Sequence, residues 1–96
     1  MELAKEIGLD IIVAQTAGLV AADMDGEKVM LNIESGKYFG LDRLGSRIWE
    51  LIEKPHTVRA LVATLLTEYD VEEKTCQNDI VAFVGTLHAK GLVDIE

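Results

Sequence analysis

The side chains best suited to chemistry are one cysteine, Cys76, and two histidines, His56 and His88. A thiolate beside an imidazole base is a common arrangement for nucleophilic catalysis. Cys76 and His88 would lie about 18 Å apart along one helix, which is too far for a hydrogen bond, and no acidic residue is suggested as an orienter for His56. Cys76 also shares an apolar stripe with Ile80 and Leu87, where a thiol acts as a small buried hydrophobe. We therefore predict that the protein is not an enzyme.

The same residues do not suggest a metal ion or a cofactor. Zinc ligands usually come in closely spaced pairs, and Cys76, His56 and His88 have no such spacing. A serine in an acidic small domain is the attachment point of carrier proteins, but Ser46 lies in Gly45-Ser46-Arg47 rather than in the Asp-Ser-Leu of those proteins. We therefore expect no metal and no cofactor.

Composition and charge narrow the class of protein. The chain has 96 residues, of which 49% are hydrophobic and 27% charged, as expected for one small globular domain. Nine basic against 17 acidic residues give a net charge of −8, which disfavours binding to nucleic acid. No apolar run approaches the roughly 20 residues that span a bilayer. The first residues lack the basic and apolar regions of a signal peptide, and a single cysteine excludes an internal disulfide, so we expect a cytoplasmic protein.

A β-hairpin is predicted around Asp25-Gly26, which lies between two apolar alternations. This dipeptide favours a type I′ turn, because both central residues of that turn need positive φ. The turn predicts strands over 19–24 and 27–34. It predicts three cross-strand pairs: Val20 with Leu31, Ala22 with Val29, and Asp23 with Lys28.

A second turn is predicted at Glu34–Lys37, before a third strand over 37–42. A three-residue loop with Gly36 in the left-handed bulge position would pair Leu31 with Phe39 and Val29 with Leu41. In that register one face of the sheet is wholly apolar, and we expect it to cover the core. Its members are Val20, Ala22, Val29, Leu31, Ile33, Phe39 and Leu41.

The apolar period then changes from two residues to 3.6, which indicates helices. A short helix carries the stripe from Leu44 to Ile52 and ends before Pro55, because proline disfavours helical backbone at the residue before it. A second helix is predicted over Val58–Tyr69, with Thr57 as a plausible N-cap.

A third helix is predicted from a capping box at Asp70–Glu73 to a left-handed C′ residue at Gly91. The apolar tail after it, 92–95, is expected to fold back onto the sheet, and Ile11–Ala14 is a possible extra strand. The predicted fold class is α+β: a three-stranded antiparallel sheet followed by three helices, with the helices on one face of the sheet.

The strand from Lys37 to Asp42 is expected to have a neighbour on one side only. Proteins usually protect such edges with charge, proline or a covering segment. The run Tyr38–Leu41 is apolar, contains no proline and has charges only at its ends. An open edge of this kind is either an aggregation hazard or a docking site for an extended peptide.

Several segments along the chain match the sequence pattern of one known family. They are Asp25-Gly26, Val29-Met30-Leu31-Asn32, Ser35 to Asp42, Gly45, Ile48-Trp49-Glu50-Leu51, Val58 to Tyr69, and Asp79-Ile80-Val81-Ala82-Phe83 to Gly91-Leu92-Val93. Together they resemble the PqqD-like precursor-recognition domains, in particular the stand-alone domains of lasso-peptide pathways. The resemblance covers residues 19–95 of a single domain, 1–96. Asp42 stands where the family commonly has Asn, and no acidic residue follows Thr57 at the third position.

The resemblance implies a winged-helix-like domain without catalytic activity. Such domains bind the leader of a ribosomally synthesised peptide precursor by β-strand addition and present it to modifying enzymes. The implied partners are the leader peptide, a leader peptidase and, less directly, a ring-closing macrocyclase. The implied peptide-binding residues are Lys37, Tyr38, Phe39, Gly40 and Leu41 on the strand, and Asp79, Phe83, Val84, Thr86 and Leu87 on the third helix.

Two other functions share this fold. A winged-helix nucleic-acid-binding domain would use the third helix for recognition, but Lys74 is the only basic residue between Glu72 and Leu87. An oligomerisation module would instead pair the open strand edge with a second copy of the chain.

Overall fold

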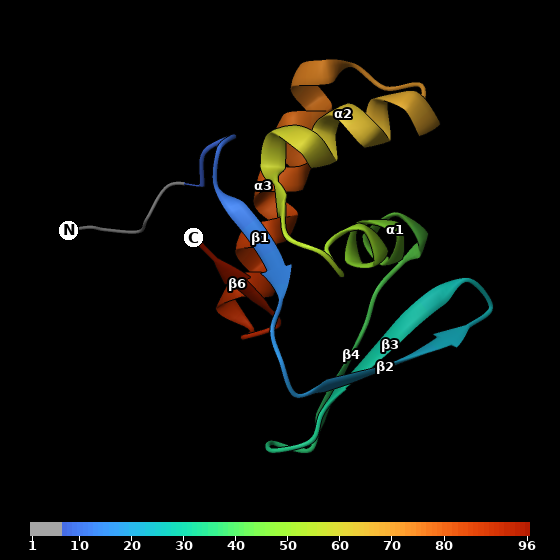
Figure 1. Ribbon diagram of the computed structural model, residues 1–96. Coiled ribbons are helices and arrows are strands. Elements are labelled where there is room, and N and C mark those ends of the chain that lie inside the picture. Colours follow the sequence, from blue (N-terminus) through green and yellow to red (C-terminus); the bar gives the residue numbers. More distant parts are fainter. Residues whose placement is uncertain (1–6) are drawn as a thin grey trace.

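The computed structural model describes residues 7–96 (Figure 1). Its elements are β1 (Ile12–Gln15), β2 (Leu19–Met24), β3 (Glu27–Asn32), β4 (Lys37–Gly40), α1 (Arg43–Leu51), β5 (His56–Thr57), α2 (Val58–Glu68), α3 (Glu73–Ala89) and β6 (Val93–Ile95). The predicted α+β class is confirmed, since an antiparallel β2-β3-β4 sheet precedes the three helices. Residues 1–6, on which the expectation about a signal peptide rests, lie outside the described range.

The first hairpin forms as predicted. Asp25 and Gly26 both have positive φ, 58° and 85°, as a type I′ turn requires. All three predicted pairs occur in the register of β2 and β3. Lys28 Nζ also lies 2.7 Å from a carboxylate oxygen of Asp23, so the pair is joined by a salt bridge.

The predicted register of the second hairpin is wrong by one residue. Leu31 pairs with Tyr38 rather than with Phe39, and residues 33–36 form the loop. The side chain of Asn32 stabilises this longer loop, because its Oδ1 accepts hydrogen bonds from the backbone N–H groups of Glu34 (3.0 Å) and Ser35 (3.2 Å).

The shift changes which face of the sheet covers the core. Met30 is fully buried and pairs with the half-buried Phe39, whereas Leu31 and Tyr38 point to solvent. The predicted apolar face was therefore right for Phe39 and Leu41 and wrong for its other members. Residues 29–31 are apolar on both faces of β3, so alternation alone did not identify the inward side.

A second three-stranded sheet, in the order β5-β1-β6, brings the two ends of the described chain together. The possible extra strand near residue 12 is confirmed as β1, which pairs with β6 through Val13 and Ile95. The carboxyl-terminal tail thus folds onto β1 and not onto the hairpin sheet, which corrects the prediction. The short strand β5 was not predicted.

Most of the helix ends predicted from capping residues agree with the structure. Thr57 is the N-cap of α2, and its hydroxyl accepts a hydrogen bond of 3.0 Å from the N–H of Ala60. Gly91 has φ of 75° directly after α3, as predicted. The predicted capping box is wrong: the N-cap of α3 is Glu72, and it makes no side-chain cap.

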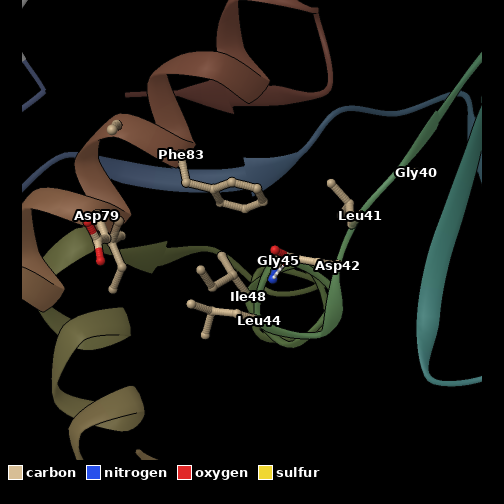
Figure 2. A pocket seen from close by; sticks show the side chains of 10 residues that line it. Gly40, Leu41, Asp42, Leu44, Gly45, Ile48, Asp79 and Phe83 are labelled. Atoms are coloured by element: carbon tan, nitrogen blue, oxygen red, sulfur yellow. Dashed lines mark hydrogen bonds between the residues drawn. The ribbon is translucent and has the colours of Figure 1, made fainter. Parts of the chain in front are cut away.

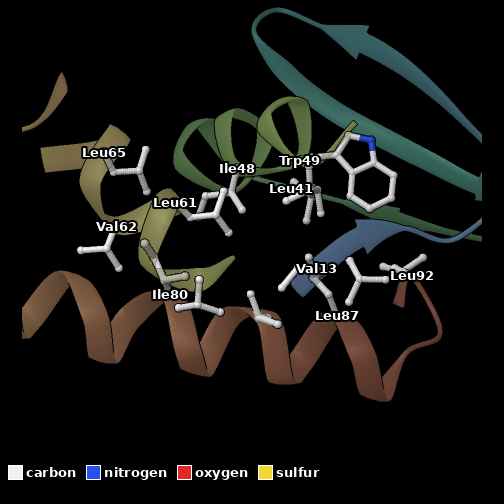
Figure 3. Close-up of a cluster of buried hydrophobic side chains, with 14 of the residues drawn as sticks. Val13, Leu41, Ile48, Trp49, Leu61, Val62, Leu65, Ile80, Leu87 and Leu92 are labelled. Atoms are coloured by element: carbon white, nitrogen blue, oxygen red, sulfur yellow. The ribbon is translucent and has the colours of Figure 1, made fainter. Parts of the chain in front are cut away.

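The core lies where α1, α2, α3 and β1 meet (Figure 3). Ile48 and Trp49 of α1, Leu61 of α2, Ile80 of α3 and Val13 of β1 are all buried there. This packing fixes α1 against α3 and places the amino-terminal end of α1 next to the end of β4. None of the helices within residues 7–96 has the length and hydrophobicity of a membrane-spanning segment.

Candidate functional site

One edge of β4 has no partner strand among residues 7–96, because β4 pairs with β3 alone. Leu41 N–H donates to the carbonyl of Lys28 at 2.8 Å, in register with the ladder. Hydrogen-bonding directions alternate along an antiparallel strand, so Tyr38 and Gly40 turn their N–H and C=O groups to the open edge. A Cβ built on Gly40 would meet no atom within 4 Å, so the sheet face at this residue is also open.

The described part of the amino-terminal segment does not cover this edge. β1 belongs to the other sheet, between β5 and β6. Ile7 lies against α3, with its Cδ1 3.5 Å from the position of a Cβ built on Gly85. The edge of β4 is therefore accessible in the part of the chain that the structure describes.

Two cavities lie between β4 and α3, one on each side of Phe83, and together they form what we call the groove. The larger has a volume of about 440 Å³ and is lined by Gly40, Leu41, Asp42, Leu44, Gly45, Ile48, Asp79, Ile80, Ala82 and Phe83 (Figure 2). The smaller has about 290 Å³ and is lined by Phe39, Gly40, Leu41, Phe83, Thr86, Leu87, Lys90 and Leu92. Both border the end of β4, so a strand added to β4 would pass along them.

The larger cavity depends on Gly45 and on the cap of α1. Asp42 is the N-cap of this helix, and its Oδ1 accepts a hydrogen bond of 2.7 Å from the N–H of Gly45. A Cβ at Gly45 would stand 2.9 Å from Phe83 Cζ, so the ring packs directly on the glycine. This close contact lets α1 and α3 approach each other under the groove.

The two ends of the groove carry opposite charges. Asp42 and Asp79 border the larger cavity. Lys90 borders the smaller one, with its Nζ 5.4 Å from the centroid of the Phe39 ring. The groove therefore has apolar walls with an acidic and a basic end.

The predicted site residues fall into two groups. The side chains or backbone of seven of them line the groove: Phe39, Gly40, Leu41, Asp79, Phe83, Thr86 and Leu87. Tyr38 and Lys37 are exposed on β4 and line neither cavity. Val84 is fully buried on the core-facing side of α3. At the open edge Tyr38 thus presents backbone groups only, and Val84 supports the groove from the core.

Sequence reasoning missed the contribution of α1 and of the residues after α3. Leu44 and Ile48 of α1 line the larger cavity, and Lys90 and Leu92 line the smaller one. Leu44 and Ile48 belong to one apolar helix stripe. The partial exposure of that stripe, with Leu44 39% exposed, is the signal that it serves more than the core.

Cys76 lies among the buried apolar side chains of the core. Cys76 is buried, and desolvation together with the nearby charges of Asp79 and Glu73 raises the pKa of its thiol. Both effects keep the thiol protonated and weaken it as a nucleophile. Within residues 7–96 no three His, Cys, Asp or Glu side chains are grouped as metal ligands.

Comparisons with known proteins agree on one family. The family model described as coenzyme PQQ synthesis protein D (PqqD) matches residues 27–93. The solved structure of TbiB1 in complex with the TbiA(beta) leader peptide is 36% identical, covers 84% of this chain and 94% of its own, and superposes with a TM-score of 0.79. Lasso peptide synthetase B1 complexed with the leader peptide is 26% identical, with coverages of 85% and 96% and a TM-score of 0.77. No curated protein matches this chain significantly in sequence.

Proposed function

This chain belongs to the PqqD family, and we propose that it binds the leader peptide of a ribosomally synthesised precursor by strand addition to the open edge of β4. The observation that carries the proposal is the accessible edge of β4 beside an apolar groove. The fold supports it, because both similar solved structures hold a leader peptide. We propose that this chain binds the leader in the cytoplasm, where the precursor is synthesised.

The edge alone supplies too little affinity. Tyr38 and Gly40 offer two N–H and two C=O groups, and each hydrogen bond contributes about 0.5–1.5 kcal/mol net. Ordering about ten leader residues costs about 2–5 kcal/mol or more. The edge therefore sets the direction and register of the leader, whereas its apolar side chains in the groove supply the surplus and the sequence preference.

The outer face of the β2-β3-β4 sheet supports a role in presenting the leader to modifying enzymes. Val20, Leu31 and Tyr38 lie in one row across the three strands and are all exposed. A leader added to β4 would extend this row with its own alternate side chains. We propose that the leader peptidase of the pathway, and less directly the macrocyclase, recognise that combined apolar face.

The direct test is binding of leader peptides to the intact chain. A display library tiled from the leaders of lasso-peptide precursors, with the TbiA(beta) leader included, is selected on the immobilised protein. The best leader is then titrated by calorimetry, with a scrambled peptide of the same composition as control. We expect a Kd between nanomolar and micromolar for the leader and none for the control. If no leader is retained, the proposed function is wrong.

Self-association through β4 is the second candidate, because an unpaired edge accepts a second copy as readily as a peptide. Light scattering over a concentration series measures it. A monomer at all concentrations that binds leader supports recognition, whereas a dimer that leader does not dissociate supports the oligomerisation module. Nucleic-acid binding has less support, since α3 carries acidic Glu73 and Asp79 beside its single Lys74, and we expect no gel shift at low salt.

A further inference from the structure

The hairpin sheet has a second open edge, at β2. The strand order is β2-β3-β4, so within residues 7–96 β2 pairs with β3 alone, on the side away from β4 (Figure 1). The two residues that flank the type I′ turn form a hydrogen-bonded pair, and such pairs alternate along an antiparallel ladder. Leu19, Ala21 and Asp23 therefore turn their backbone N–H and C=O groups to the open edge.

The core does not extend beneath β2. Ala21 pairs with Met30, so the two side chains lie on the same face of the sheet, the one that faces α1. Met30 is fully buried, whereas Ala21 is exposed, as are all residues of β2 after Leu19. Proteins usually protect an apolar edge strand with several charges, and β2 carries only Asp23. The strand is thus suited to pair with another chain.

A further cavity, which we call the β2 cavity, lies between this strand and α1. It has a volume of about 220 Å³ and is lined by Gln15, Ala21, Lys28, Trp49, Glu50 and Glu53. It shares no lining residue with the groove. Its volume equals that of roughly seven water molecules at about 30 Å³ each, so a long side chain can enter. On a strand added to β2, the residue opposite Ala21 would direct its side chain to this cavity.

Trp49 presents a hydrogen-bond donor at the β2 cavity that no described residue satisfies. Its side chain is 3% exposed, and Figure 3 shows the indole nitrogen on the side of the ring turned away from the apolar cluster. Within residues 7–96 Trp49 bonds to a side chain only through its carbonyl, which accepts a hydrogen bond of 2.8 Å from Gln15 Nε2. A buried donor without an acceptor costs about 1–3 kcal/mol. A peptide carbonyl that enters the cavity would remove this cost.

The charges at the β2 cavity favour a basic guest. Lys28 is already neutralised, because its Nζ lies 2.7 Å from Asp23 and 3.5 Å from Glu50. The carboxylate of Glu53 is exposed and takes part in no ion pair among the described residues. A guanidinium in the cavity would have two carboxylates to bind, those of Glu50 and Glu53. A second copy of this chain, with its net charge of −8, is a poorer occupant, since it would bring further acidic groups to the same edge.

We propose that the open edge of β2 and the β2 cavity form a second peptide-binding site, which takes an extended, basic segment of a partner protein. The backbone of that segment would pair with β2 and supply a carbonyl to the indole N–H of Trp49. One arginine or lysine side chain would enter the cavity and bind Glu53 and Glu50. The edges of β2 and β4 lie on opposite sides of one sheet, so a partner held at β2 leaves the leader edge free. This inference goes beyond the proposed function and does not depend on it.

The test uses the indole N–H of Trp49 as a reporter. The chain contains one tryptophan, so this group gives a single resonance in a ¹H–¹⁵N NMR spectrum. The probes are three short synthetic peptides of alternating threonine and valine that carry arginine, glutamine or glutamate at one central position. We expect the arginine peptide to shift the indole resonance and the amide resonances of Ala21 and Asp23, and to bind about tenfold more tightly than the glutamate peptide. If the indole resonance does not move, or if the three peptides bind equally, the proposal is wrong.

Two matched variants test the role of Glu53. Glu53→Gln removes the proposed counterion. Glu34→Gln is the control, because Glu34 is exposed in the loop between β3 and β4 and lines neither the β2 cavity nor the groove. We expect Glu53→Gln to weaken binding of the arginine peptide about fivefold and to leave the glutamine peptide unchanged, whereas Glu34→Gln should affect neither. Thermal unfolding checks that both variants keep the fold, and an equal effect of the two would overturn the site.

Competition with leader shows which edge the arginine peptide occupies. Saturation with the best leader from the tiled library should leave the affinity of the arginine peptide unchanged. Displacement by leader, or shifts at Tyr38 and Gly40 in place of Ala21 and Asp23, would assign the peptide to β4 and overturn the β2 site. An indole resonance that shifts with protein concentration in the absence of peptide would assign β2 to a second copy and overturn it as well. If no leader binds, the proposed function is wrong, and the peptide titration still decides the β2 site.

Discussion

The ring of Phe83 rests on Gly45, so close that a Cβ on the glycine would lie 2.9 Å from Cζ of the ring. The contact joins α3 to the first turn of α1. Phe83 also stands between the two cavities of the groove and contributes to both. One contact between a glycine and a phenylalanine therefore holds the helices together and shapes the surface proposed to receive the leader.

Gly45→Ala is expected to weaken leader binding while leaving the fold intact. A methyl group at this position forces the half-buried Phe83 ring to turn into the groove, and the helix gains up to about 1 kcal/mol from the better helix former. The free energy of unfolding should thus change little, whereas Kd should rise about tenfold. Urea unfolding and calorimetry measure the two effects. Unchanged affinity would mean that the leader does not contact the ring.

Phe83→Ala is expected to weaken leader binding by about 1–3 kcal/mol, because it removes the wall shared by both cavities. Val81→Ala is the matched control, since Val81 is on the same helix and lines neither cavity of the groove. Calorimetry with the folded variants should show the loss for Phe83 alone. Equal affinities of the two variants would place the binding site elsewhere.

N-methylation of the leader backbone should affect binding with a period of two residues. Only Tyr38 and Gly40 of β4 turn their polar groups outward, so only alternate leader N–H groups can donate to them. We expect a large loss of affinity at those positions and little change at the residues between them. A synthetic N-methyl scan read out by fluorescence anisotropy measures this. Uniform tolerance would rule out strand addition.

Ser46→Ala is expected to reduce the free energy of unfolding by about 1–3 kcal/mol, because it leaves buried polar groups unsatisfied. The buried Ser46 hydroxyl accepts a hydrogen bond of 2.7 Å from the N–H of Lys28 and donates one of 3.3 Å to the carbonyl of Leu41. It thus joins α1 to the hairpin sheet. Ser35→Ala in the exposed loop is the control, and urea unfolding is the measurement. A loss no larger than that of the control would contradict the role.

The ion pair between Arg47 and Glu68 should make stability depend on pH in acid. Its closest N–O distance is 2.6 Å, and the hydrogen bond from Arg47 lowers the pKa of the Glu68 carboxyl from its ordinary value of 4.5. A lowered folded-state pKa gives stability that is present above pH 4.5 and is lost as the pH falls through the folded value.

Glu68→Gln should therefore unfold more easily than the wild type at neutral pH, and the difference should shrink below pH 4.5. High salt should reduce the difference at neutral pH, because both side chains are partly exposed. Glu53→Gln is the control, since Glu53 is exposed and takes part in none of the ion pairs among the described residues. A difference that is independent of pH would contradict the ionic origin.

Part of the fold was determined by near neighbours in the sequence. The turn at Asp25-Gly26, the N-cap at Thr57 and the helix end at Gly91 were predicted, because each depends on the conformation of a few adjacent residues. The open edge was predicted for a similar reason, since an apolar last strand without proline or internal charge is visible in the sequence. The predicted site residues on α3 came from the family resemblance and not from the spacing of apolar residues in the sequence.

The tertiary structure determined the inward face of β3 and the shape of the groove, because both depend on which surfaces pack against each other in the folded chain. Residues 29–31 fit either face of β3, and only the packing of the core around Met30, which includes Ile48 and Trp49 of α1, selected the inward face and left Leu31 in solvent. The contact of Phe83 with Gly45 and the two cavities of the groove join segments that are far apart in the chain. Local propensity carries no information about such pairs, since their energy exists only once α1 and α3 are packed together.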